Sequence, residues 1–239
     1  MEGSVNGRRL AAQPGLGNAA FLFSSISSTS ILCWDAMLTL HGDIRSGNCL
    51  KAKWLLDLLR RDYRWLETDV TTGATRTPEF MALNPAGQVP LLVLDDGRTV
   101  AQSNAILLYL AEDTDLVPRD AYERVRMFEW LFWEQYSHEP CIAVARFQRL
   151  YLGKAADEIE PRLMERGRAA LDRMERALSA EVWLAGGTEA TIADLALVAY
   201  TRVAHEGGFE LSSYPAIRDW IGRTEAVFGI RPQAGPCRR

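Results

Sequence analysis

The sequence predicts a two-part fold, with a small α/β domain in the N-terminal half and an all-helical domain in the C-terminal half. Strand-like and helix-like segments alternate between Met37 and Glu112, which favours a sheet covered by helices. Beyond residue 121 no strand pattern of any length appears, and apolar residues recur at helical spacing. A length of 239 residues is sufficient for two such domains with a buried core.

The first segments predict a βαβ unit. Residues 37–41 form a short apolar strand that ends at Gly42, and residues 63–70 form a second strand. Between them, apolar residues repeat at the spacing of one helix face, namely Ala52, Leu55, Leu56 and Leu59. Two parallel strands need such a crossover helix between them.

A hairpin and two more helices follow in the α/β half. Thr77-Pro78 predicts the start of a short helix over residues 80–83, because threonine caps helices and proline suits the first helical position. Asp95-Asp96-Gly97 is a hairpin turn signal between the apolar runs 89–94 and 98–101. With a last helix over residues 104–112, the order βαβαββα is that of a thioredoxin-like domain, although the pattern alone allows other small α/β sheets.

The helical domain is expected over residues 121–230. Residues 122–136 predict a long aromatic helix, and two later helices show apolar stripes, one with Leu163, Gly167, Ala170, Leu171, Met174 and Leu178, the other with Ile192, Leu195, Ala196, Ala199 and Val203. Thr191 and Asp194 form a capping box at the start of the second of these.

The remaining stretches are assigned to linkers and ends. We place the α/β domain at residues 37–113 and a polar linker at residues 114–120. Residues 1–36, rich in glycine, serine, asparagine and glutamine, are interpreted as a disordered extension or as the result of a start codon assigned too far upstream. Residues 231–239 are expected to form a loose tail.

Composition excludes several classes of function. The chain carries 27 basic and 31 acidic residues without a basic stripe, which argues against a nucleic-acid partner. No apolar stretch approaches a membrane span. The 4 cysteines (Cys33, Cys49, Cys141, Cys237) and 3 histidines are scattered, so we expect no metal and read the cysteines as free thiols in a reducing cytoplasm.

Four motifs carry a family resemblance. They are Ser46-Gly47-Asn48-Cys49, Gln88-Val89-Pro90, Gln102-Ser103 and Thr191-Ile192-Ala193-Asp194. In this order and spacing, the chain from about Met37 to about Ile230 resembles soluble, bacterial-type glutathione S-transferases of the serine- or asparagine-using, theta- or nu-like classes. The resemblance implies glutathione as co-substrate, no metal, and a homodimer with each site near the interface.

The resemblance places the catalytic contact in the loop before the first helix. In the serine-using classes a serine here donates a hydrogen bond to the glutathione sulfur, a role that falls on Ser46; some bacterial relatives use an asparagine, matched by Asn48. Lowering a thiol pKa of about 8.5 by about two units takes roughly 2.7 kcal/mol, and one hydrogen bond to a charged group supplies roughly 1.5–3 kcal/mol. One hydroxyl aided by the helix dipole is therefore enough. Alternatively, both residues only cap the helix.

The resemblance also assigns residues to the other parts of glutathione. Ser103, expected to cap the helix behind it, and the adjacent amides are assigned to the γ-glutamyl carboxylate. Gln102 replaces the acidic residue commoner there. A cis bond before Pro90 is expected to turn the backbone of Val89 toward the cysteinyl residue, with Gln88 contacting the tripeptide backbone.

Two parts of the site are less defined by the motifs. The glycyl end lacks the histidine of some classes, and Lys51 or Arg76 is the candidate replacement. For the second substrate, the candidates on the aromatic helix and just beyond it are Trp133, Tyr136 and His138, although aromatic residues at helical spacing are more often core.

The predicted function is conjugation of the glutathione thiolate to a small electrophile, as in detoxification enzymes. A first alternative is a glutathione-dependent disulfide reductase or peroxidase that uses Asn48 or Cys49 near the sulfur. A second is a non-catalytic interaction module on the same fold, although such modules tend to lose the residues that contact the thiol.

Overall fold

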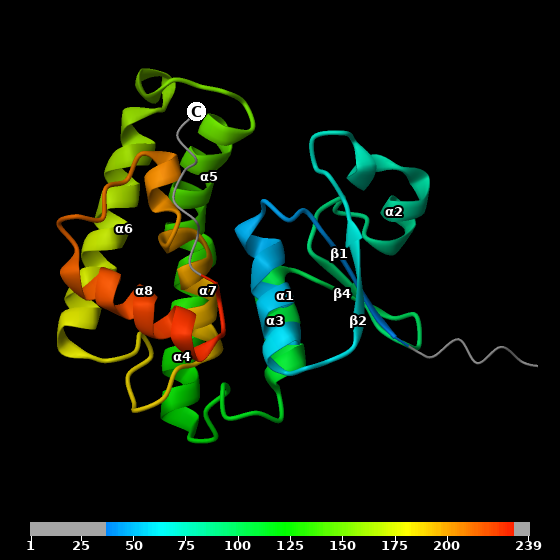
Figure 1. The fold of residues 1–239 in the computed structure, drawn as a ribbon, viewed down its shortest axis with the longest axis horizontal. Coiled ribbons are helices and arrows are strands. Elements are labelled where there is room, and N and C mark those ends of the chain that lie inside the picture. The colour runs from blue at the N-terminus through cyan, green and yellow to red at the C-terminus, as the bar shows by residue number, and fades with distance from the viewer. Residues whose placement is uncertain (1–36, 232–239) are drawn as a thin grey trace, which may run out of the picture. The chain divides into compact units, whose positions relative to one another are not determined.

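The computed structural model describes residues 37–231, drawn in colour in Figure 1. The predicted extension over residues 1–36 lies outside this range, as does the predicted tail apart from Arg231. The described residues contain the two predicted parts in the predicted order, so the fold class is confirmed.

A four-stranded mixed sheet forms the centre of the N-terminal half. The strands are β1 (Leu38–Gly42), β2 (Tyr63–Glu67), β3 (Leu91–Val93) and β4 (Thr99–Ala101), in the spatial order β2-β1-β3-β4. β1 is parallel to β2, with Leu40 opposite Trp65, and antiparallel to β3. β3 and β4 form the predicted hairpin, whose turn contains Gly97 at a φ of 84°.

Three strands are shorter than predicted, β4 by one residue and β2 and β3 by more. β2 ends at Glu67 because the Asp69 carboxylate accepts a hydrogen bond from the N–H of Thr71 at 2.7 Å and turns the chain. β3 begins at Leu91 rather than at Val89, since Pro90 has no N–H to give to the neighbouring strand.

Three helices complete this half. α1 (Gly47–Leu58) and α3 (Ser103–Ala111) lie together on one side of the sheet, and α2 (Pro78–Leu83) lies on the other side, after the short turn η1 (Ala74–Arg76) (Figure 1). The predicted apolar face of α1 is confirmed, because Ala52, Leu55 and Leu56 are fully buried. Thr77 caps α2 by accepting a hydrogen bond from the N–H of Phe80.

The C-terminal half is helical throughout the part that the structure describes. Its elements are α4 (Ala121–Trp133), the π-helical segment η2 (Glu134–His138), α5 (Glu139–Leu150), η3 (Ala156–Glu158), α6 (Pro161–Ala180), α7 (Ile192–Thr201), η4 (Ala204–Gly207) and α8 (Pro215–Val227). The predicted aromatic helix thus continues through a π turn into α5 instead of ending near Tyr136.

The capping box at the start of α7 is confirmed. The Thr191 side chain accepts from the N–H of Ala193, and the Asp194 carboxylate accepts from the N–H of Thr191 at 2.9 Å. The same buried carboxylate also accepts from the N–H of Leu184 and from Trp220 Nε1. Burial raises the pKa of Asp194, while these donors act to lower it. The box therefore ties together three segments of the helical core.

The larger of two apolar clusters in the described residues is shared by both halves. Leu55 of α1, Leu107 of α3 and Leu195 of α7 belong to the same buried cluster. The loops at the N-terminal ends of α1 and α3 are thereby held against the helical half, where the candidate site forms.

Candidate functional site

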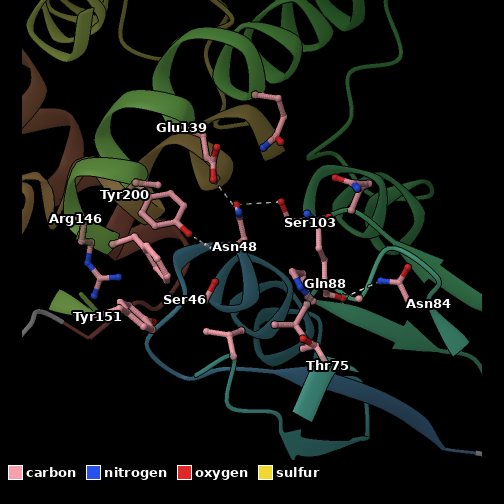
Figure 2. Close-up of a pocket in the computed structure, with 18 of the residues that line it drawn as sticks. Ser46, Asn48, Thr75, Asn84, Gln88, Ser103, Glu139, Arg146, Tyr151 and Tyr200 are labelled. Atoms are coloured by element: carbon pink, nitrogen blue, oxygen red, sulfur yellow. Dashed lines mark hydrogen bonds between the residues drawn. The ribbon is translucent and has the colours of Figure 1, made fainter. Parts of the chain in front are cut away.

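A cavity of about 460 Å³ lies between the two halves (Figure 2). Its size falls in the range of small-molecule pockets. From the N-terminal half it is lined by Ser46, Asn48, Val70, Thr75, Arg76, Asn84, Gly87, Gln88, Val89, Pro90, Gln102 and Ser103. From the helical half it is lined by Gln135, Glu139, Ala143, Arg146, Phe147, Tyr151 and Tyr200.

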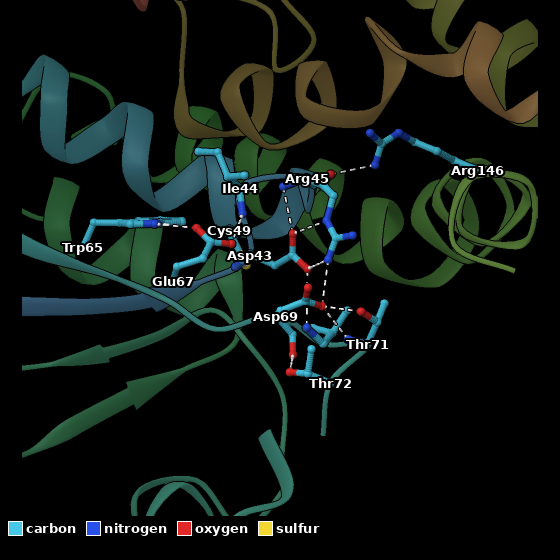
Figure 3. Close-up of polar contacts among 11 residues, drawn as sticks. Asp43, Ile44, Arg45, Cys49, Trp65, Glu67, Asp69, Thr71, Thr72 and Arg146 are labelled. Carbon is cyan, nitrogen blue, oxygen red and sulfur yellow. Dashed lines mark hydrogen bonds and ion pairs between the residues drawn. The ribbon is translucent and has the colours of Figure 1, made fainter. Parts of the chain in front are cut away.

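The loop between β1 and α1 is fixed by a buried carboxylate (Figure 3). Asp43, which is fully buried, accepts hydrogen bonds from the backbone and side chain of Arg45, and Arg45 also pairs with Asp69 at 2.8 Å. Burial alone would raise the pKa of Asp43, but its hydrogen bonds from Arg45 and Val70 hold it below the usual value. The loop therefore presents Ser46 in a defined position.

Ser46 occupies the N-cap position of α1, but its side chain makes no capping hydrogen bond. The alternative that this hydroxyl only caps the helix is therefore not supported. Its neighbours are the Cys49 thiol and the Tyr200 hydroxyl. Burial raises the pKa of both groups, and hydrogen bonding with Ser46 acts in the opposite direction.

Asn48 lies at the point where both halves meet. Its backbone N–H donates to the Tyr200 oxygen at 3.3 Å, and its side-chain Nδ2 donates to Glu139 Oε1 at 3.3 Å. Its Oδ1 accepts from Lys51 Nζ at 2.8 Å and from the Ser103 hydroxyl at 3.2 Å. The side chain lines the cavity and is held from both sides, so it too is more than a cap (Figure 2).

Lys51 was expected to contact glutathione, and the structure contradicts this. The side chain is fully buried and does not line the cavity. Its ammonium pairs with Glu134 at 2.8 Å, behind Asn48. Arg76 and Thr75 do line the cavity, so the other candidate for the glycyl end is in reach of a ligand.

Cys49 is fully buried, and its sulfur accepts a hydrogen bond from the N–H of Asp43 at 3.4 Å. Burial raises the pKa of the thiol to about 11. A thiol in this state is neither ionised at neutral pH nor open to a disulfide.

The segment before β3 carries the predicted cis peptide bond between Val89 and Pro90. Asn84 shapes this segment, because its Nδ2 donates to the carbonyl of Gln88 at 2.8 Å and its Oδ1 accepts from the N–H of Ala86 at 3.2 Å. The exposed Gln88 and the half-buried Val89 line the cavity.

The prediction that Ser103 caps α3 is wrong. The helix begins at Ser103 itself, and the capping position is held by Gln102, which makes no side-chain cap. The Ser103 hydroxyl points instead at Asn48. Gln102 has a φ of 73°, a left-handed conformation that is uncommon and strained for a residue other than glycine. Both residues line the cavity, so this strain lies at the N-terminus of α3, where backbone N–H groups lack helical partners.

The three residues expected at the second-substrate site do not line the cavity. His138 is fully buried and pairs with Thr201, while Tyr136 is 80% exposed. Trp133 lines a separate hollow against α6. Tyr136 and His138 belong to the π turn η2, whose wider turn changes which residues face the N-terminal half, whereas Trp133 precedes it.

The helical half supplies other residues to the cavity. Arg146 and Tyr151 lie together at one end of the cavity (Figure 2). The Phe147 ring, which also lines the cavity, stacks on Tyr151 with ring centroids 4.7 Å apart. Arg146 also donates to the carbonyl of Arg45 at 2.7 Å and pairs with Glu206. The sequence carries no motif for these positions, because stacked aromatic residues at helical spacing resemble an ordinary core face.

Tyr200 reaches the cavity because residue 47 is glycine. A Cβ at Gly47 would meet the Tyr200 ring at 2.8 Å, so a larger residue would push the ring away. The signal in the sequence was the glycine itself, which permits a close approach.

Within residues 37–231 no group of three or more His, Cys, Asp or Glu side chains is arranged to hold a metal ion. The same residues contain no helix with both the length and the apolar character needed to cross a bilayer.

Comparison with known proteins places the chain in a family. The family described as glutathione S-transferase, N-terminal domain, matches residues 45–113, and that described as glutathione S-transferase, C-terminal domain, matches residues 137–226. A glutathione S-transferase from Pseudomonas fluorescens is 46% identical, with a TM-score of 0.77 over 80% of this chain and 95% of that one. The chain belongs to the glutathione S-transferase family.

Two more distant relatives carry names other than glutathione S-transferase. The disulfide-bond oxidoreductase YfcG of Escherichia coli is 30% identical over 196 residues, 77% of this chain and 87% of the relative. Ure2p, solved in complex with glutathione, is 27% identical, with a TM-score of 0.71 over 81% of this chain and 97% of that one. Membership in the family therefore leaves the reaction to be argued from the site.

Proposed function

We propose that this protein conjugates the thiolate of reduced glutathione to a small electrophile. One observation carries the proposal: Ser46 and Asn48 present a hydroxyl and an amide in the same cavity, between a polar end and an aromatic end. The similarity to Ure2p, which was solved with glutathione, supports this ligand.

Glutathione is placed along the polar end. Its γ-glutamyl carboxylate binds at the N-terminus of α3. The donors are the free backbone N–H groups and the Ser103 hydroxyl, which turns from Asn48 to the carboxylate when glutathione binds. The backbone of Val89 pairs with the cysteinyl residue as an added strand would, and Gln88 and Gln102 supply side-chain contacts. Arg76 takes the glycyl carboxylate in place of Lys51.

The sulfur is held by Ser46 and Asn48. A hydrogen bond from a neutral donor to a thiolate contributes roughly 1.5–3 kcal/mol, and a shift of two pKa units needs roughly 2.7 kcal/mol. The N-terminus of α1 adds the favourable end of its dipole. These groups suffice to ionise the thiol near neutral pH.

The electrophile is placed against Phe147 and Tyr151. Stacked rings favour a flat apolar substrate, and the Arg146 guanidinium beside them favours an electron-rich substituent such as a nitro or carboxylate group. In the attack the thiolate donates its electron pair to the electrophilic carbon, and the leaving group departs with its bonding electrons.

A glutathione-dependent disulfide reductase is the second candidate, favoured by the similarity to YfcG and by the position of Asn48. In that reaction the thiolate of glutathione attacks one sulfur of a disulfide, a new S–S bond to glutathione forms, and the other sulfur leaves as a thiolate. Cys49 takes no part because its thiol is buried. A non-catalytic interaction module is less favoured, because such a module has no need of a cavity with the Ser46 hydroxyl and the Asn48 amide in its lining.

The proposal includes a homodimer in the cytoplasm. Aromatic and apolar side chains stand exposed along one face of α4 and into η2, namely Tyr122, Val125, Phe132 and Tyr136. Their spacings of three, seven and four residues place them on one side of the helix, and such a patch marks a protein interface. Sedimentation of the wild type and of Phe132→Asp tests this, and a monomeric wild type would refute it.

Two assays test the reaction. Calorimetric titration with glutathione measures binding, and incubation with a chloronitrobenzene or with a mixed disulfide separates thioether from disulfide products. Ser46→Ala should lower the conjugation rate at neutral pH by roughly ten- to a hundred-fold and move the pH–rate profile upward. Ser179→Ala, an exposed serine on α6, is the control. No binding at millimolar glutathione would refute the proposal, and an unmoved profile would leave Asn48 as the partner of the sulfur.

A further inference from the structure

Lys51 stands out as a charged side chain with no exposure to solvent. An ammonium has three donors, and all three are used: Asn48 Oδ1 at 2.8 Å, Glu134 Oε1 at 2.8 Å and the Ser103 hydroxyl at 3.4 Å. A buried lysine is costly unless it is paired and fully hydrogen-bonded. This arrangement is complete, yet the Lys51 side chain itself does not line the cavity.

The effect of Lys51 falls on the amide of Asn48. Oδ1 of that amide accepts two hydrogen bonds, from Lys51 and from Ser103. Turning the amide over would place its NH₂ group against the ammonium, so only one orientation satisfies the network. In that orientation one Nδ2 proton goes to Glu139. The other is left for a ligand in the cavity.

Glu134 anchors the lysine from the opposite side. Its Oε1 holds Lys51, and its Oε2 accepts from Asn104 at 3.1 Å and from Gln135 at 2.6 Å. The carboxylate comes from the π-helical segment η2, and Asn104 comes from α3. The ammonium is thereby fixed between three elements and has little freedom to release Asn48.

We propose that Lys51 is a positioning residue, which holds the Asn48 amide with its free N–H toward the glutathione sulfur. This inference rests on the proposed function. Lys51 contacts neither glutathione nor the electrophile and acts only through Asn48. Because a donor polarised by a neighbouring cation binds an anion more strongly, the ammonium also strengthens the Asn48 donor for a thiolate.

The test compares the titration of bound glutathione, followed by thiolate absorbance, with kcat/KM across pH. Lys51→Met alone leaves Glu134 as an uncompensated buried charge, so the main variant is Lys51→Met with Glu134→Gln. It should raise the pKa of the bound thiol by about one unit and, through the smaller thiolate fraction, lower kcat/KM at neutral pH about three-fold. Lys53→Met, which removes a partly exposed lysine paired with Asp57 on the same helix, is the matched control.

A double-mutant cycle separates positioning from general stability. In an Asn48→Ala background, removing Lys51 and Glu134 should not move the thiol pKa further, because the group through which they act is gone. Glu134→Gln alone leaves the Lys51 ammonium without its counter-charge but keeps its contact with Asn48, so in the folded variant the thiol pKa should be no higher than in the wild type. This single variant also serves if the Lys51 variants do not fold.

The outcomes are distinct. A folded Lys51→Met/Glu134→Gln variant with unchanged thiol titration overturns the inference. So does a rise in thiol pKa from these two substitutions that is equally large in the Asn48→Ala background. The inference is also overturned if Glu134→Gln alone raises the pKa of the bound thiol as much as the loss of Lys51 does. Wild-type protein that binds no glutathione refutes the proposed function, and the inference falls with it.

Discussion

Replacing His138 by glutamine should remove a pH-dependent loss of stability. The Thr201 hydroxyl donates to the carbonyl of Leu197 at 2.7 Å, so it accepts from His138 Nε2 at 2.9 Å. Nδ1 is then the unprotonated nitrogen, and it has no hydrogen-bond partner among the described residues. Protonating it would bury a charged N–H without an acceptor, which agrees with the burial that lowers the pKa of His138 from 6.5 to about 4.

The direction in which stability changes with pH follows from proton uptake at His138. The lowered pKa means that, as pH falls from 6.5 toward about 4, the unfolded chain binds a proton at this position and the folded chain does not. Stability from the neutral histidine is therefore complete above pH 6.5 and is lost as pH falls to about 4. Such a pKa difference corresponds to roughly 3 kcal/mol. Glu134 acts to raise this pKa and Lys51 to lower it, both less than burial does.

Urea unfolding of both proteins across this pH range measures the effect. The wild type should lose roughly 3 kcal/mol more than His138→Gln between neutral pH and about pH 4. Glutathione kinetics at neutral pH should be alike, because His138 lies outside the cavity. His205→Gln, an exposed histidine, is the control and should keep the wild-type pH dependence. Equal pH dependence in His138→Gln and wild type would show that this histidine is not held neutral.

Three further substitutions test the site. Cys49→Ala should retain most conjugation activity, since the buried thiol has a pKa raised to about 11; a glutathione adduct at this cysteine would contradict this. Ser103→Ala should raise the KM for glutathione more than it lowers kcat, as steady-state kinetics would show, because it weakens anchoring in every state of the reaction. Gly47→Ala should lower kcat/KM at least about ten-fold by displacing Tyr200, whereas Gly222→Ala, whose new methyl group meets open space, should leave activity unchanged.

The sequence predicted the features that depend on local pattern. The apolar face of α1, the hairpin turn at Gly97 and the capping box at Thr191 each follow from neighbouring residues, and the structure has all of them. The cis bond before Pro90 followed from the family resemblance and is also present. Element ends were less accurate, because they depend on single side chains such as Asp69.

An irregular turn contributed to the misprediction of the second-substrate end. A continuous α-helix was expected over residues 122–136, but the π turn at η2 shifts the faces that follow it. The residues that reach the cavity from α5 are Glu139, Ala143, Arg146 and Phe147, at the spacing of one helix face. That face mixes charge, a small residue and an aromatic ring, so no hydropathy pattern distinguishes it from a solvated surface.

The position of Asn48 explains why the site needs both halves of the chain. Its amide is set by Lys51 and Ser103 from the N-terminal half, but Lys51 is held by Glu134, and the amide nitrogen is held by Glu139. Without the helical half, a buried ammonium would lose its partner and the amide would lose one of its two constraints. Because these contacts span 83 and 91 residues, no local motif encodes them. In the proposed function, activation of the glutathione thiol therefore depends on the junction of the two halves rather than on the thioredoxin-like domain alone.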